Sequence, residues 1–275
     1  MLQEAESSAR QAAARSELNI VPLADSRARQ DAVDLLNRVW NASLPLVSAA
    51  SLRAYDFSGN YVHGAFRNGQ MIAVAIAFMG PGHLHSDLVG VLPDGQGGGV
   101  GFALKQHQRF WALQRDLPEV RWTFDPLLRR NAYFNLHRLG ANADTYLPDF
   151  YGTLVDGING ADPTDRLYVR WRVGSARAAA AAQGRLPDID PEILRNAQVR
   201  VDRDGQLSRA DPTSSNDVRL VAVPADIAGI RKSDPELASR WRYAVRTALS
   251  DLAAEGYEIV DFSPDGYYVL QPAHG

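Results

Sequence analysis

The chain has 275 residues, of which 45% are apolar, and a formal net charge of −3 from 29 basic and 32 acidic residues. That length and composition suffice for one large or two modest folded domains. The near-neutral charge gives no general attraction to nucleic acid or to an anionic membrane. No cysteine is present, which excludes disulfides, thiolate nucleophiles and cysteine-ligated metals.

The most apolar run, 71–79, has nine residues, fewer than the roughly 20 that a helix needs to span a bilayer. Residues 1–17 mix Ala, Ser, Gln, Arg and Glu and lack the apolar core of a secretion signal. We therefore expect a cytoplasmic protein, with no membrane or nucleic-acid partner, that begins with a frayed tail.

The first regular elements follow this tail. Residues 18–23 predict a short strand, and 28–40 carry apolar residues at helical spacing. A weaker helical pattern occupies 44–55. The region thus predicts one strand followed by two helices.

A β-hairpin is the clearest local prediction. Residues 61–67 and 70–79 both have strand character, and Asn68-Gly69 joins them. Asn-Gly accepts the positive φ angles of a two-residue hairpin turn. The second run is apolar on both faces, as in a central strand covered on two sides.

Alternating strand and helix patterns continue to residue 173. Strands are expected at 83–91, 120–124 and 167–173, and helices at 100–115 and 131–139. The order predicts an α/β fold with a mixed central sheet flanked by helices.

The C-terminal third differs in composition. Residues 174–217 are Ala-rich and then polar, and are expected to form a linker. Residues 218–270 predict a small α/β unit around an amphipathic helix at 235–255. Ser233 and Glu236 have the spacing of a capping box at the start of this helix.

Trp241 of that helix lies among Arg240, Arg242 and Arg246. An aromatic residue among basic ones can contact nucleic acid. We expect instead that Trp241 is a core residue and that the arginines form a solvated helix face.

A glycine-rich turn lies between the strand at 83–91 and the helix at 100–115. Glycines let the backbone approach a ligand closely. The first turn of a helix offers unpaired N–H donors and a partial positive charge, which together suit a pyrophosphate. A turn that merely begins the helix is the plain alternative.

Three phosphate-binding patterns can be compared with this turn. A P-loop requires Gly-Lys-Ser/Thr, which is absent, and the spacing of the dinucleotide fingerprint fails from Gly95, Gly97 and Gly99. The pattern Gln/Arg-x-x-Gly-x-Gly/Ala is met by Gln96, Gly99 and Gly101.

The turn resembles the acyl-CoA signature of the GNAT acetyltransferases in its sequence Val91-x-Pro93-x-x-Gln96-Gly97-x-Gly99-x-Gly101. The resemblance covers about 18–173, which is the expected acetyltransferase domain. Residues 123–127, 130–136 and 139–141 also resemble a poorly characterised GNAT subgroup that carries a C-terminal extension.

The resemblance implies acetyl-CoA as acyl donor, no metal, and a small amine or a peptide as acceptor. It implies that the turn holds the pyrophosphate, that the preceding strand pairs with the pantetheine arm, and that an asparagine after the next strand contacts that arm. The expected cofactor-binding residues are Leu88, Val89, Val91, Gln96, Gly97, Gly98, Gly99, Val100, Gly101, Asn131 and Asn135. For Asn131 the alternative is a helix cap.

The family's mechanism is direct attack of the amine on the thioester, which needs no cysteine. Asp125 is the expected base, although an Asp before Pro often only forms a turn. In many members of this family, a tyrosine that protonates the leaving thiolate stands at the position that Leu136 occupies in this chain. Tyr133, Tyr146 and Tyr151 are therefore the candidate acids, with solvent or simple packing as the alternatives.

His83 and His85 alternate on one strand without a carboxylate at ligand spacing, so a metal site is not expected. His107 is expected to be a hydrogen-bonded core residue. Two further functions stay open: an acyl-CoA sensor without catalysis, and an interaction protein whose glycine turn is structural. The segment 218–270 is expected to pack on the first domain, where it shapes the acceptor site or forms a homodimer contact.

Overall fold

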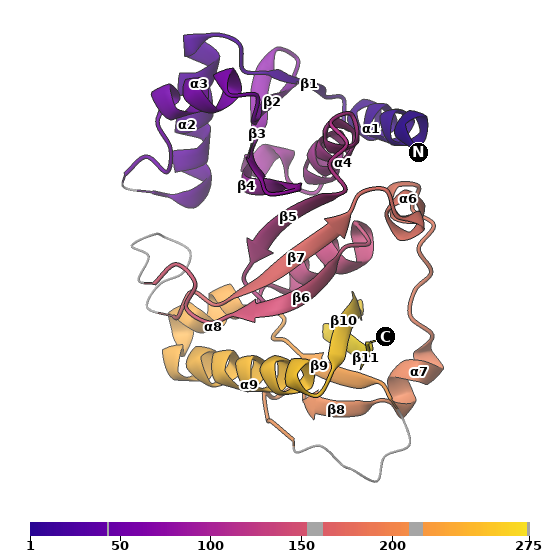
Figure 1. The fold of residues 1–275 in the computed structure, drawn as a ribbon. Helices are drawn as coiled ribbons and strands as arrows, with labels where there is room; N and C mark the ends of the chain where they lie inside the picture. The colour runs from indigo at the N-terminus through magenta and orange to yellow at the C-terminus, as the bar shows by residue number, and fades with distance from the viewer. Residues whose placement is uncertain (43, 153–161, 209–216, 274–275) are drawn as a thin grey trace. The chain divides into compact units, whose positions relative to one another are not determined.

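The computed structural model describes residues 1–42, 44–152, 162–208 and 217–273 (Figure 1). Contacts divide these residues into two compact units. Unit 1 contains 1–122 and 172–183, and unit 2 contains the rest. None of the described helices is long and apolar enough to cross a membrane.

Unit 1 is built on a mixed sheet with the strand order β1-β2-β3-β4-β5. The first four strands pair antiparallel, and β4 pairs with β5 in parallel. The bounds are β1 Asn19–Pro22, β2 Tyr61–Arg67, β3 Gln70–Gly80, β4 His83–Val91 and β5 Glu119–Phe124. The hairpin prediction is confirmed, because Asn68 and Gly69 join β2 to β3 with φ angles of 51° and 78°.

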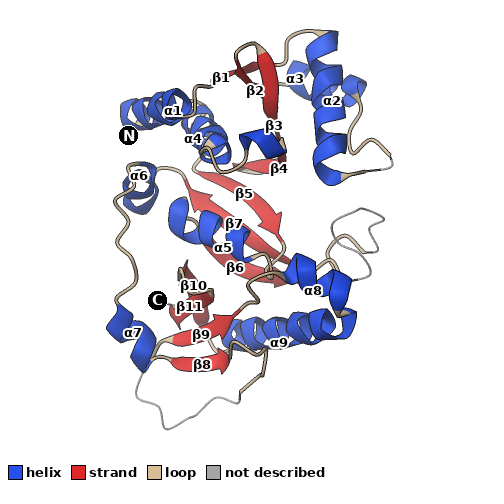
Figure 2. Cartoon of the chain, turned by 180° about the vertical axis from the view of Figure 1, so that it is seen from behind, coloured by secondary structure: helices blue, strands red, loops and turns tan. Residues whose placement is uncertain are grey.

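Helices cover both faces of this sheet. The helices α2 (Ser26–Trp40) and α3 (Ala49–Phe57) lie on one side, and α4 (Val100–Leu113) lies on the other (Figures 1 and 2). Leu36 and Leu52 pack with Val74 and Ile76 of β3 in a buried apolar cluster. The predicted α/β fold, with helices flanking a mixed sheet, is confirmed.

The expected frayed N-terminus is wrong. Residues 2–15 form α1 (Leu2–Arg15), which packs along α4. Four small residues at helical spacing are buried on its inner face: Ala5, Ser8, Ala9 and Ala12. Arg109 of α4 is fully buried and donates to both carboxylate oxygens of Glu4, at 3.0 and 2.7 Å. A stripe of alanines can pack closely against another helix although it gives only a weak hydrophobic signal.

The described strands of unit 2 follow the order β7-β6-β10-β11-β9-β8. Their bounds are β6 Asn142–Leu147, β7 Arg166–Arg172, β8 Gln198–Val201, β9 Arg219–Ala222, β10 Tyr257–Phe262 and β11 Tyr267–Pro272. β10 and β11 form an antiparallel hairpin. Figure 2 shows the long helix α9 (Pro235–Ala254) beside β8 and β9, which it contacts.

The remaining helices differ in detail from expectation. The helix expected at 131–139 is a short α5 (Arg129–Ala132) followed by a π-helical turn, η2 (Tyr133–Arg138). The range 174–217, expected as a linker, contains α6 (Ala176–Ala182), α7 (Pro191–Asn196) and β8. Its part 209–216 lies outside the described residues.

The capping box predicted from Ser233 and Glu236 for the start of α9 is wrong. Ser233 is the last residue of α8 (Ile227–Ser233), and its hydroxyl donates to the carbonyl of Gly229. Asp234 caps α9 instead, because its side chain accepts from the Leu237 amide at 2.9 Å. The apolar face of α9 is buried as predicted, including Trp241.

Candidate cofactor and catalytic site

The glycine-rich turn connects the 3₁₀ turn η1 (Pro93–Gly95) to the start of α4. Gly97 and Gly99 have φ angles of 82° and 78°, and Gly99 is the N-cap of α4. Such left-handed conformations favour glycine. Because Gly97, Gly98 and Gly99 are all exposed, a ligand has access to their backbone.

The electrostatics of this turn favour an anion. The first turn of α4 contains no acidic residue. Its N–H groups have no partner within the helix, and the helix dipole adds a partial positive charge there. Val100 is buried beneath the turn, and Gly101 is half-buried. The side-chain nitrogen of Gln96 lies 3.5 Å from the Val91 carbonyl, at the limit of a hydrogen bond.

β4 enters this turn with one edge open. Its pairing with β5 ends at His85 and Arg121. Beyond that point, 88–91 continue to pair with β3, whereas no described strand pairs with their other edge. Leu88, Val89 and Val91 are half-buried. An open strand edge offers backbone donors and acceptors to an extended ligand.

Asp87 lies where the pairing of β3 and β4 shifts register. Ile76 pairs with Leu88 and Ala77 with Ser86, so Asp87 is the extra residue of a bulge. Its side chain is exposed, and partial desolvation raises the pKa of its carboxyl above the ordinary value. Sequence reasoning missed this residue, because nothing in the strand pattern marks the bulge.

A buried polar cluster ties α4 to the same bulge. The Lys105 amine donates to the Ser86 hydroxyl at 2.8 Å, and that hydroxyl donates to Oε1 of Gln108 at 3.1 Å. The amine also lies 3.8 Å from the centre of the Trp122 ring. Burial lowers the pKa of Lys105 to about 7.

Two histidines of unit 1 form local hydrogen bonds. Nδ1 of His107 forms a hydrogen bond of 2.9 Å with the Tyr61 hydroxyl, as expected of a hydrogen-bonded core residue. His83 bonds the carbonyl of Pro81 at 3.0 Å. Among the described residues no group of three or more His, Asp or Glu side chains is arranged to hold a metal ion.

Asp125, the expected base, is buried in unit 2 in an ion-pair network. Arg242 donates to both of its oxygens, at 2.8 and 3.1 Å, and Arg231 donates at 2.6 Å. Burial acts to raise the pKa of Asp125, but the two arginines outweigh it and hold the pKa below the ordinary value. A carboxylate held in this way is a poor proton acceptor.

The expected solvated arginine face of α9 is wrong at two of its three positions. Only Arg240 is exposed. Arg242 is fully buried, and Arg246 donates to both oxygens of the buried Asp165, at 2.8 and 2.6 Å.

The two candidate asparagines also belong to unit 2. Asn131 is exposed on α5 and is not its cap, since Leu128 occupies that position. Asn135 is buried in the π-helical turn, where its backbone carbonyl accepts a hydrogen bond from the Ala141 amide at 3.1 Å.

The three candidate tyrosines have different surroundings in unit 2. Tyr133 is half-buried and stacks on His137, with ring centres 5.0 Å apart. The Tyr146 hydroxyl donates to Asp165 at 2.6 Å, and burial together with this carboxylate raises the pKa of Tyr146 well above its ordinary value. Tyr151 is exposed, with its hydroxyl 3.2 Å from that of Thr123.

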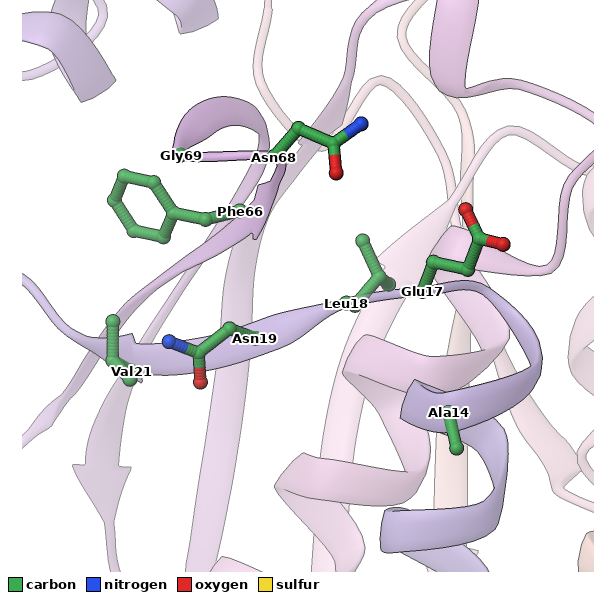
Figure 3. A pocket seen from close by; sticks show the side chains of 8 residues that line it. All are labelled: Ala14, Glu17, Leu18, Asn19, Val21, Phe66, Asn68 and Gly69. Atoms are coloured by element: carbon green, nitrogen blue, oxygen red, sulfur yellow. The ribbon is translucent and has the colours of Figure 1, made fainter.

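An open pocket of about 520 Å³ lies between the end of α1, β1 and the β2–β3 turn (Figure 3). None of the site residues expected from the sequence lines it. Its lining residues are Ala14, Glu17, Leu18, Asn19, Val21, Phe66, Asn68 and Gly69.

No protein-family model matches the chain, and no curated protein matches it. Solved structures are similar to part of it. One is the ribosomal-protein-S18-alanine N-acetyltransferase of Escherichia coli, at 19% identity and a TM-score of 0.48 over 58% of this chain and 96% of that one. Another is diaminobutyrate acetyltransferase of Paenibacillus lautus, solved with its substrate and coenzyme A, at 14% identity and a TM-score of 0.46 over 58% and 97%.

A third is a GNAT family acetyltransferase of Elizabethkingia anophelis with acetyl-CoA bound, at 14% identity and a TM-score of 0.43 over 57% and 98%.

Proposed function

We propose that the chain binds acetyl-CoA and transfers its acetyl group to an amine of a small molecule or peptide. The proposal rests on three features that follow one another along the chain. They are the open edge of β4, the exposed glycine turn with two left-handed residues, and the start of α4. This arrangement suits an extended ligand that ends in a diphosphate. The sequence of the turn also resembles the acyl-CoA signature of the GNAT acetyltransferases.

In this proposal residues 96–101 bind the pyrophosphate through backbone N–H groups. The backbone of Leu88, Val89 and Val91 binds the pantetheine arm and contacts the thioester oxygen. Asn131 or Asn135 supplies a further hydrogen bond to the arm. Unchanged coenzyme A affinity in both Asn131→Ala and Asn135→Ala would remove the asparagines from the site.

The acceptor amine attacks the thioester carbonyl, a C–N bond forms, the C–S bond breaks, and the thiolate leaves. A base must take the amine proton, and a proton must reach the thiolate. We propose Asp87 as the base, since its carboxyl is exposed on β4 and has a raised pKa. Tyr133, Tyr146 or Tyr151 is the acid, unless solvent protonates the thiolate.

Calorimetric titration with acetyl-CoA tests the binding step. Absence of binding to the folded protein would leave the glycine turn with a structural role, as in an interaction protein. Thiol release in the presence of a panel of amines tests the transfer step. Binding without release from any amine would favour an acyl-CoA sensor. Gly99→Val is the binding-site control, because its side chain would collide with the Ser16 hydroxyl and strain a backbone with a φ of 78°, which disturbs the turn.

A further inference from the structure

Ser16 connects the N-terminal helix to the glycine turn. It directly follows α1 and is 5% exposed. Its hydroxyl donates to the carbonyl of Gly98 at 2.8 Å, across 82 positions of sequence. A methyl group placed on Gly99 would lie 2.9 Å from the same hydroxyl oxygen. The end of α1 is therefore in close contact with the exposed turn.

Arg67, the last residue of β2, also contacts Ser16. Its Nε and Nη2 atoms donate to the Ser16 carbonyl at 3.2 and 2.8 Å. A methyl group placed on Gly98 would lie 3.8 Å from Nη2. The guanidinium thus lies beside the turn, and no described carboxylate forms an ion pair with it.

The hydrogen bond from Ser16 to Gly98 determines where the N–H of Gly99 points. In a trans peptide the C=O and N–H bonds point to opposite sides. Because Ser16 holds the Gly98 carbonyl on its own side, the N–H of Gly99 in the same peptide points away from Ser16. Fixing this peptide before a ligand arrives also lowers the entropy lost on binding.

We propose that Ser16 and Arg67 form a clamp that positions the glycine turn for the diphosphate of the cofactor, which makes α1 part of the binding site. The proposal rests on the proposed function. Ser16 acts through the Gly98–Gly99 peptide, and Arg67 acts through Ser16 while adding a positive charge beside the bound anion.

The test is an NMR titration of the full chain with coenzyme A and with pantetheine, which lacks the diphosphate. NMR also measures affinities in the millimolar range. We expect Ser16→Ala to weaken coenzyme A binding about five- to tenfold, the effect of one lost hydrogen bond. Arg67→Gln should weaken it at least as much, because it removes a positive charge as well as hydrogen bonds to Ser16. Pantetheine affinity should stay unchanged, and Ser16→Thr should restore coenzyme A binding.

Matched controls are Ser7→Ala, an exposed serine of α1, and Arg53→Gln, an exposed arginine of α3. Neither should change either affinity. Equal losses for coenzyme A and pantetheine would overturn the clamp, since they would indicate a general structural effect. So would unchanged coenzyme A affinity in Ser16→Ala.

Amide exchange separates this inference from the proposed function. If the wild-type chain fails to bind coenzyme A, the proposed function fails. The clamp is then judged by the exchange rates of the amides of residues 97–99 without ligand. Faster exchange in Ser16→Ala than in Ser7→Ala supports the clamp, and equal rates overturn it.

Discussion

Arg242 of α9 forms a buried bidentate ion pair with Asp125, which lies 117 positions earlier in the chain. Their side chains are 1% and 3% exposed. Arg231 bonds the same carboxylate, and both arginines also donate to Asp162. The network thus pairs two carboxylates with two guanidinium groups, so its charges balance. It joins the end of β5 to α8 and α9 within unit 2.

Arg242→Met should destabilise unit 2 strongly, because it leaves Asp125 buried with only one arginine partner. Breaking a buried pair from one side costs about 3–5 kcal/mol. Urea unfolding measures the loss. Arg240→Met, on the exposed face of the same helix, is the control and should change stability by less than about 0.5 kcal/mol. Similar midpoints for the two variants would contradict the assignment.

Gly97 and Gly99 offer a matched pair of substitutions. Both have positive φ, so alanine at either position costs about 1–2 kcal/mol of backbone strain. A methyl group on Gly97 meets nothing within 4 Å, whereas one on Gly99 meets Ser16. Gly99→Ala should therefore be less stable than Gly97→Ala in thermal unfolding. Equal stability would show that the turn adapts without cost.

Stability should fall as pH falls below about 6.5, because two histidines stay neutral in the folded chain. Burial, with the charges of His107 and Arg115, lowers the pKa of His63 to about 3, and burial lowers that of His107 to about 4. The unfolded chain takes up protons near 6.5, where the folded chain does not. At pH 5 each histidine then costs about 2 kcal/mol.

Urea unfolding at pH 7.5 and pH 5 measures this effect. The double variant His63→Gln, His107→Gln should lose part of the difference between the two pH values and keep the part due to His85, whose pKa is lowered to about 4, mainly by burial. A wild-type chain that is equally stable at both would contradict the assignment of neutral, buried histidines.

Asp87→Asn should lower kcat about 10²–10⁴-fold if Asp87 is the base. Acetyl-CoA affinity should not change. The wild-type rate should rise with pH through a pKa above that of an ordinary Asp, because the base must be ionised and its pKa is raised. Asp94→Asn, an exposed residue of η1, is the control. A variant that keeps wild-type kcat would exclude Asp87 as the base.

The three tyrosines can be separated by replacement with phenylalanine. Tyr146→Phe should destabilise the chain by about 1–3 kcal/mol, because Asp165 loses a buried donor. Tyr151→Phe should have little effect on stability, because its hydroxyl is exposed. The true acid is the residue whose replacement lowers kcat while acetyl-CoA affinity stays intact. If all three variants keep wild-type kcat, solvent protonates the thiolate.

The sequence alone determined the features that depend on neighbouring residues. Asn68-Gly69 specifies a tight hairpin because both residues accept positive φ. The spacing from Gln96 to Gly101 specifies an exposed turn at a helix start. The periodicity of α9 specifies which face it buries, since 3.6 residues per turn bring Trp241, Val245 and Leu252 to one side.

The tertiary structure decided the features whose partners are distant in the chain. Nothing near Arg242 indicates that it is buried, because burial of a charge is favourable only when Asp125 and Asp162 are already in place. The alanines of α1 form a buried face only because α4 lies against them. The bulge at Asp87 arises from pairing with β3, and Ser16 gains its contact because folding brings α1 to Gly98.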